Sequence, residues 1–360
     1  MKQTIPKPDR VDMLREVARH VVLDFLLLVL LLIVVGSAMG SPAIAVKTST
    51  YSLSAVNLAV VINDADPASV EVGEYYRMAR HIPAANMVHV RIEGSAKVLS
   101  AEAFEHLKQS IESQLAPDIE AIALVWTIPY AVECNSITSA LTLGFDAKLC
   151  RHSCAPSKAS AYFDSASSNP EADFHMRLSM LLPIESVAKA EALIDRGVAS
   201  HPVPASAYLL STSDAARNVR ARFYPPSGRF TQKFFSIYSI KSDVLENVDD
   251  VMFYFTGLPS VGKLDTVHFV AGALADHLTS TGGDLLGTDQ MSSLRWLDAG
   301  ATASYGTVSE PCNYPQKFPQ PSVLMKHYLS GATAIEAYWK SVAWPLQGVF
   351  IGEPLAAPYK

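Results

Sequence analysis

The chain has 360 residues, of which 49% are hydrophobic and 18% are charged, and its formal net charge is −6. This composition is typical of a globular protein with enough apolar material for a core. No cluster of Lys and Arg follows residue 45, which argues against nucleic acid and anionic membrane surfaces as partners.

The first 45 residues differ from the rest. Basic residues precede the apolar run Phe25–Val35, and Ala43-Ile-Ala45 follows it. This order predicts a secretory signal peptide over residues 1–45, and hence a periplasmic or extracellular protein. The alternative is an uncleaved anchor that holds the chain in the inner membrane through residues 21–35, although a span needs about 20 apolar residues.

The rest of the chain alternates strand-like and helix-like segments. The continuous apolar run 56–62 predicts a strand buried on both faces, and Ser69 is a candidate N-cap for the helix that follows. Further strands are expected at 87–92, 119–126, 207–211, 234–240, 251–255 and 348–351, and in the runs that end at His277 and Thr307. Helices are expected at 70–81, 101–115, 186–197, 214–223, 289–298, 321–330 and 333–342. The alternation predicts one α/β domain over residues 46–360, a mainly parallel sheet with helices on both faces.

An irregular insert, residues about 127–173, interrupts this alternation and contains three of the four cysteines. The cysteines are Cys134, Cys150, Cys154 and Cys312, and an even count in an exported chain favours two disulfides of undetermined pairing. Cys150, His152 and Cys154 are a rival set of zinc ligands, but no fourth donor lies nearby, so no metal is expected.

The sharpest candidate site follows the run that stops at His277. Ser280 could act as a nucleophile with His277 as its base, and Asp276 or Asp284 could orient the imidazole. Backbone N–H groups of Gly282 and Gly283 could bind an oxyanion, and Thr279 is a further candidate contact to a ligand. The alternative is a strand end whose hydroxyls satisfy turn and cap hydrogen bonds, with His277 packed and paired.

Cys312 is a second candidate nucleophile. It lies beside Glu310 and Asn313 after the run that ends at Thr307, and His277 belongs to the preceding strand and loop. A cysteine in an exported chain is more often half of a disulfide.

Other side chains have both a functional and a structural interpretation. Asp64 and Asp66 could bind a metal or a polar ligand, or could simply form an Asp–Pro turn. The aromatic residues Tyr305, Trp339 and Trp344 could form a stacking platform for a sugar or peptide, or could belong to the core. Arg217, Asn218 and Arg220 could bind a carboxylate of a partner, or could form a solvated helix face.

Five segments of the chain together resemble an uncharacterised family of exported bacterial proteins from species that carry exosortase, a membrane system that sorts proteins with a Pro-Glu-Pro signal. The segments are Asn63–Ser69, Thr212–Arg220, His277–Gly283, Gly300–Asn313 and Glu336–Tyr359. The resemblance implies an association with that system and gives little about activity.

The end of the chain is also similar to the end of gingipain-type cysteine proteases, which have a caspase-like fold. The matching segments are Gly300-Ala301, Gly331–Ala337 and Gly352–Leu355. This resemblance puts the protease His-Gly position at Thr256-Gly257, which are therefore candidate ligand contacts, and the Cys position near Thr279–Gly282. It implies a protease-like fold that lacks the standard Cys–His dyad.

We therefore expect an exported accessory protein that acts on a peptide, a protein or a surface polysaccharide of the exosortase system, without a cofactor. An active hydrolase that uses His277 with Ser280 or Cys312 is the first alternative. A carbohydrate- or peptide-binding module is the second.

Overall fold

The computed structural model describes residues 53–230 and 234–360, which belong to one compact unit, Ser49–Lys360. The expected signal peptide lies outside the described residues. Within the described ranges, no helix has the length and apolar character needed to cross a membrane.

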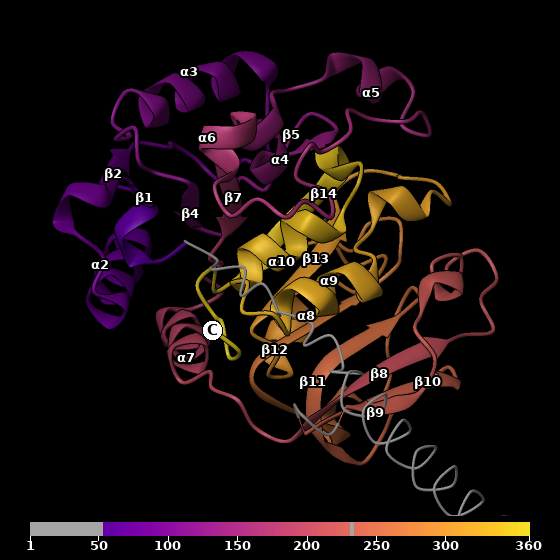
Figure 1. The fold of residues 1–360 in the computed structure, drawn as a ribbon. Coiled ribbons are helices and arrows are strands. Elements are labelled where there is room, and N and C mark those ends of the chain that lie inside the picture. Colours follow the sequence, from indigo (N-terminus) through magenta and orange to yellow (C-terminus); the bar gives the residue numbers. More distant parts are fainter. Residues whose placement is uncertain (1–52, 231–233) are drawn as a thin grey trace, which may run out of the picture. The chain divides into compact units, whose positions relative to one another are not determined.

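The centre of the fold is an eleven-stranded sheet with the order β2-β1-β4-β7-β14-β13-β12-β11-β8-β10-β9 (Figure 1). Its strands are β1 (Leu58–Asn63), β2 (Met87–Val90), β4 (Ala121–Val125), β7 (Leu178–Leu181), β8 (Ala205–Ser211), β9 (Gly228–Phe230), β10 (Phe235–Lys241), β11 (Val248–Thr256), β12 (Val267–His277), β13 (Ala303–Thr307) and β14 (Gly348–Gly352). β1, β4 and β7 are buried along their whole length. β4 is wholly apolar, as a strand covered on both faces requires, and β1 and β7 each contain one polar residue, Asn63 and Ser179.

Two parallel halves make up this sheet. The first half contains β2, β1, β4, β7 and β14, and the second contains β13, β12, β11, β8 and β10. The two halves meet where β13 and β14 pair antiparallel, and β9 adds an antiparallel strand at the edge of the second half. The strands β8, β10, β11, β12 and β13 therefore all end at the same edge. Open α/β sheets bind ligands at the carboxyl ends of their strands, so this edge positions the candidate residues.

Helices flank both faces of the sheet, which confirms the predicted fold class. They are α2 (Pro67–Arg80), α3 (Ala101–Glu112), α4 (Ile137–Leu143), α5 (Ala147–Arg151), α6 (Pro170–Phe174), α7 (Val187–Val198), α8 (Leu294–Asp298), α9 (Pro321–Tyr328) and α10 (Ala334–Ser341). The crossovers from β1 to β2 and from β2 to β4 run in opposite directions, so right-handed connections place α2 and α3 on opposite faces. α9 and α10 pack side by side, as do α2 and α7 (Figure 1).

Side-chain caps set the helix boundaries. The carboxylate of Asp66 accepts a hydrogen bond from the N–H of Ala68 at 3.0 Å, so Asp66 caps α2, and not Ser69 as the sequence suggested. The hydroxyl of Ser69 is buried and instead donates to the carbonyl of Val125 at 2.5 Å. Ser69 therefore joins α2 to β4.

Further expectations from the sequence differ from the structure. The helix expected at 289–298 is shorter and covers only Leu294–Asp298. The segment predicted as a helix at 214–223 consists of turns and a short 3-10 helix, Ala221–Phe223. After one i→i+4 bond, from the N–H of Asn218 to the carbonyl of Asp214, the backbone hydrogen bonds of this segment become the i→i+3 kind. β7 was not predicted, since it is short and Ser179 interrupts its apolar sequence. The insert contains α4, α5, α6 and a hairpin of β5 (Ala131–Val132) and β6 (Asn135–Ser136), each too short to show a period in the sequence.

Candidate functional site

The candidate residues gather at the carboxyl edge of the second half of the sheet. Thr256 ends β11 and His277 ends β12, and the two are paired in register, so their side chains lie on the same face. Thr307 ends the next strand, β13, and its hydroxyl donates to the carbonyls of Thr279 at 3.1 Å and Ser280 at 2.9 Å. The loop after β12 is thereby fixed against β13.

His277 lies in the interior with 1% of its surface exposed. Trp296 donates its indole N–H to Nδ1 of His277 at 2.9 Å, so the ring proton is on Nε2, which donates to the carbonyl of Met291 at 3.0 Å. Burial lowers the pKa of His277 to about 3. The imidazole is therefore neutral at physiological pH, and both of its nitrogens have partners.

Ser280 is half-buried, and no hydrogen bond joins it to His277 in the ranges the structure describes. The expected nucleophile–base pair is therefore not formed. The neighbouring hydroxyl of Thr279 donates to Oε1 of Gln290 at 2.5 Å and accepts from Nε of Arg217 at 3.1 Å. Thr279 thus serves in a network that orders the loop.

Gly282 and Gly283 allow close packing of the backbone. The N–H of Gly283 donates to the carbonyl of Thr307 at 2.9 Å, so it is already occupied and does not face an oxyanion. A Cβ atom on Gly283 would lie 2.5 Å from the carbonyl oxygen of Gly306. The carbonyl of Gly282 accepts hydrogen bonds from both the N–H and the hydroxyl of Ser293.

A buried ion pair lies behind this loop. Nη1 of Arg220 lies 2.5 Å from Oδ1 of Asp276, and each side chain is 1% exposed. Arg220 also donates to the carbonyls of Thr256 at 2.9 Å and Asp276 at 3.1 Å. Burial raises the pKa of Asp276 to about 6, against the opposing effect of Arg220. Asp276 is thus paired with Arg220, and it does not orient the imidazole of His277.

Thr256 and Gly257 continue the same edge. Thr256 is fully buried and its hydroxyl has no partner within residues 53–230 and 234–360. The carbonyl of Gly257 accepts a hydrogen bond from the hydroxyl of Thr212 at 2.8 Å. A Cβ atom on Gly257 would lie 2.0 Å from the carbonyl oxygen of Arg217, so only glycine lets these two segments approach.

All four cysteines form disulfides, Cys134 with Cys150 and Cys154 with Cys312. The disulfides predicted from the sequence are confirmed. Cys312 is therefore not a free thiol in this structure, and the hypothesis that it is a resting nucleophile is corrected. Two disulfides fit an oxidising, exported environment.

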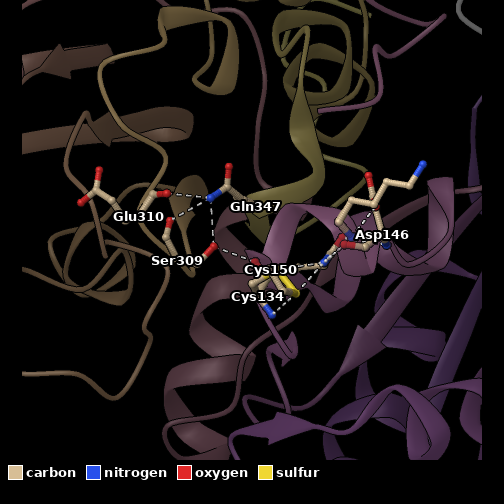
Figure 2. The surroundings of a disulfide bond; sticks show 8 residues. Cys134, Asp146, Cys150, Ser309, Glu310 and Gln347 are labelled. Atoms are coloured by element: carbon tan, nitrogen blue, oxygen red, sulfur yellow. Dashed lines mark hydrogen bonds between the residues drawn. A yellow bond between two sulfur atoms is a disulfide. The ribbon is translucent and has the colours of Figure 1, made fainter. Parts of the chain in front are cut away.

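The insert contacts the candidate edge through the Cys154–Cys312 disulfide and through hydrogen bonds. Figure 2 shows the Cys134–Cys150 disulfide beside Ser309, whose hydroxyl donates to the carbonyl of Cys134 at 2.7 Å. Gln347 donates to the Ser309 hydroxyl at 3.0 Å and to the carbonyl of Glu310 at 2.8 Å. The carboxylate of Glu310 accepts from the N–H of Cys312 at 2.7 Å, so Glu310 orders the turn before the disulfide.

The remaining candidates have structural partners. Asp64 lies 2.9 Å from Nδ1 of His89, away from the second half of the sheet, and Asp66 is the cap of α2. Tyr305 and Trp339 are buried and donate to backbone carbonyls, and half-buried Trp344 packs on Tyr314. These aromatic residues therefore belong to the core and its margin. No group of three metal-ligating side chains occurs in the described part of the chain.

Sequence reasoning missed Trp296 and Gln290, which provide the key contacts to His277 and Thr279. Trp296 lies 19 residues after His277, on α8, and only the return of the chain brings them together. Arg217 and Asn218, by contrast, were among the candidates from the sequence. Polar residues that follow a strand of a parallel sheet lie at its carboxyl edge, as these two do.

The chain matches no protein-family model, and no curated protein matches it in sequence. Two solved structures resemble it over most of its length. One is a complex of the pro- and mature domains of Porphyromonas gingivalis RgpB, with a TM-score of 0.44 and 11% identity over 84% of this chain and 79% of that chain. The other is the Arg-specific cysteine proteinase gingipain R (RgpB), with a TM-score of 0.43 and 12% identity over 84% of this chain and 78% of that chain.

Proposed function

We propose that this chain is an exported accessory protein of an exosortase-linked sorting or surface-polysaccharide system, and that it binds its partner without hydrolysing it. One observation supports binding without hydrolysis. Both ring nitrogens of His277 are engaged by Trp296 and Met291, so His277 is not available as the base for Ser280. Cys312, the other nucleophile considered, is paired with Cys154.

The exosortase link is supported by the sequence segments that resemble the exosortase-associated family, chiefly His277–Gly283 and Gly300–Asn313. His277–Gly283 and the part of Gly300–Asn313 that follows Thr307 lie at the carboxyl edge of the second half of the sheet, and open α/β sheets bind ligands at such an edge. The partner is a peptide, a protein or a polysaccharide of that system.

Complementation in a host that carries exosortase tests this proposal. The gene is deleted, and wild-type protein or Ser280→Ala is restored. The readouts are the surface retention of proteins with a Pro-Glu-Pro signal and the amount of surface polysaccharide. We expect deletion to reduce at least one of them and Ser280→Ala to restore it, since the Ser280 hydroxyl makes no hydrogen bond with His277.

Labelling of the purified protein is the second arm. A fluorophosphonate probe reports an activated serine, and iodoacetamide reports a free thiol. We expect neither to react before denaturation. Labelling of Ser280, or a Ser280→Ala variant that behaves like the deletion, would replace the proposal with the active hydrolase. A deletion without effect on either readout would contradict the accessory role.

A further inference from the structure

The strands β8 and β10 run parallel and stop together (Figure 1). A cup lined by polar residues lies at the ends of these strands. Its volume is about 370 Å³, and it is lined by Ser211, Thr212, Ser213, Asn218, Lys241 and Asp243 among others. Small-molecule sites occupy about 300–1,000 Å³, so the cup has the size of a small ligand. It lies at the carboxyl ends of parallel strands, where β8 has β10 on one side and β11 on the other.

The walls of the cup are fixed before any ligand binds. The carbonyl oxygen of the Asn218 side chain accepts from the N–H of Thr212 at 3.1 Å. The two carboxylate oxygens of Asp243 accept from the N–H of Ser213 at 2.7 Å and from its hydroxyl at 2.6 Å. A site whose side chains are already oriented loses less entropy on binding.

Several polar groups of the cup have no partner within residues 53–230 and 234–360. They are the side-chain NH₂ of Asn218, the ammonium of Lys241 and the hydroxyl of Ser211. A carboxylate has about four acceptor positions, and Asp243 uses two of them. Lys241 and Asp243 are exposed to solvent, so the cup offers hydrated donors and acceptors that a ligand can reach.

The charges of the cup decide which ligand fits. Hydrogen bonds from Ser213 lower the pKa of Asp243, so its carboxylate is ionised at neutral pH, and Asp214 lies close enough to interact with it. An anionic ligand would meet these carboxylates, and a cationic ligand would meet the ammonium of Lys241. A neutral ligand with many hydroxyl groups can use the donors and the acceptor together.

We propose that this cup binds a single neutral sugar residue, as part of a longer polysaccharide chain. The Lys241 ammonium and the Asn218 NH₂ donate to oxygen atoms of the sugar, and the Asp243 carboxylate accepts from its hydroxyls. The inference rests on the proposed function and names polysaccharide as the partner class.

Saturation-transfer NMR on the purified protein tests the cup. The probes are methyl glycosides of glucose, galactose and N-acetylglucosamine, with glucuronate and inorganic phosphate for comparison. We expect at least one neutral glycoside to bind at millimolar concentration. Lys241→Ala and Asp243→Asn should each weaken that binding about tenfold, since each removes a hydrogen bond to a charged group.

Matched controls are Lys148→Ala and Asp118→Asn, which alter exposed residues outside the cup and should leave binding unchanged. A circular dichroism melt confirms that each variant is folded. The inference is overturned if no neutral glycoside binds, if glucuronate or phosphate binds more tightly, or if the two cup variants bind as wild type does.

The two proposals can fail separately. If wild-type protein binds no neutral glycoside but Ser280→Ala complements the deletion normally, the sugar site is rejected. The accessory role then remains, with a peptide or protein partner. Intact glycoside binding with no effect of deletion in the cell would remove the exosortase link and leave a sugar-binding protein.

Discussion

The indole N–H of Trp296 donates to Nδ1 of His277 over 2.9 Å in the interior of the protein. This bond fixes the tautomer of the imidazole and, with the bond to the Met291 carbonyl, occupies both ring nitrogens. His277 ends a strand, and the sequence made it a candidate general base. In the structure it is a packed and neutral residue of the core.

Trp296→Phe should lower the free energy of unfolding by about 1–3 kcal/mol, because it leaves Nδ1 of His277 buried without a donor. The phenyl ring retains much of the contact with Tyr254, whose ring centroid lies 5.0 Å from that of Trp296. Urea denaturation measures the change. Trp344→Phe is the control, since Trp344 is half-buried and its indole N–H has no partner in the described structure. Equal losses in the two variants would contradict the assigned bond.

The lowered pKa of His277 predicts a pH dependence. The unfolded chain takes up a proton on this residue below about pH 6.5, whereas the native protein does so only near pH 3. Stability therefore falls as the pH drops through this window, by at most about 1.4 kcal/mol per pH unit from this residue. Wild type should lose stability more steeply than His277→Gln between about pH 6.5 and pH 4. Parallel pH profiles of the two proteins would show that His277 is not buried neutral.

The buried pair of Arg220 and Asp276 predicts a non-additive effect. Arg220→Met alone should destabilise the protein by about 3–5 kcal/mol, because it leaves the Asp276 carboxylate buried without its partner. Arg220→Met combined with Asp276→Leu should recover part of that loss. Denaturant unfolding of the two single variants and the double variant gives the coupling energy. Additive losses would mean that the pair does not interact in solution.

The disulfides should contribute unequally to stability. Cys154 and Cys312 are 158 residues apart, and Cys134 and Cys150 are 16 residues apart. The chain-entropy model gives about 5 kcal/mol for the longer loop and about 3 kcal/mol for the shorter one. Replacing each pair by serine, and measuring the unfolding of both variants, checks the order. Intact mass after alkylation should show no modified cysteine until the protein is reduced.

Gly257→Ala should destabilise the protein or displace the segment around Arg217, since the new Cβ atom would lie 2.0 Å from the Arg217 carbonyl oxygen. Gly262→Ala is the matched control, because a Cβ atom there meets nothing within 4 Å. Thermal melts of the two variants give the comparison. A Gly257→Ala melt at the wild-type temperature would contradict the close approach of the two segments.

Much of the α/β pattern can be read from the sequence, because burial on both faces produces unbroken apolar runs. The run 56–62 corresponds to β1, and the runs ending at His277 and Thr307 correspond to β12 and β13. The helix expected at 214–223 does not continue beyond one turn, since after the bond from the N–H of Asn218 to the carbonyl of Asp214 the backbone forms i→i+3 bonds.

The sequence also singled out the edge that contains the candidate site, because parallel strands end together. What each residue does there depended on contacts that carry no sequence signal. His277 is neutral because Trp296 returns to it on α8, and Asp276 is charge-paired because Arg220 reaches it from another loop.

By itself, the amino-acid sequence determined the α/β fold class, the presence of disulfides and the strand ends where polar residues gather. These follow from the local periodicity of apolar residues and from composition. Only the tertiary structure decided the antiparallel junction of β13 and β14, the pairing of Cys154 with Cys312 and the partners of His277. Each depends on which distant segments meet, and that is fixed by the packing of the whole sheet.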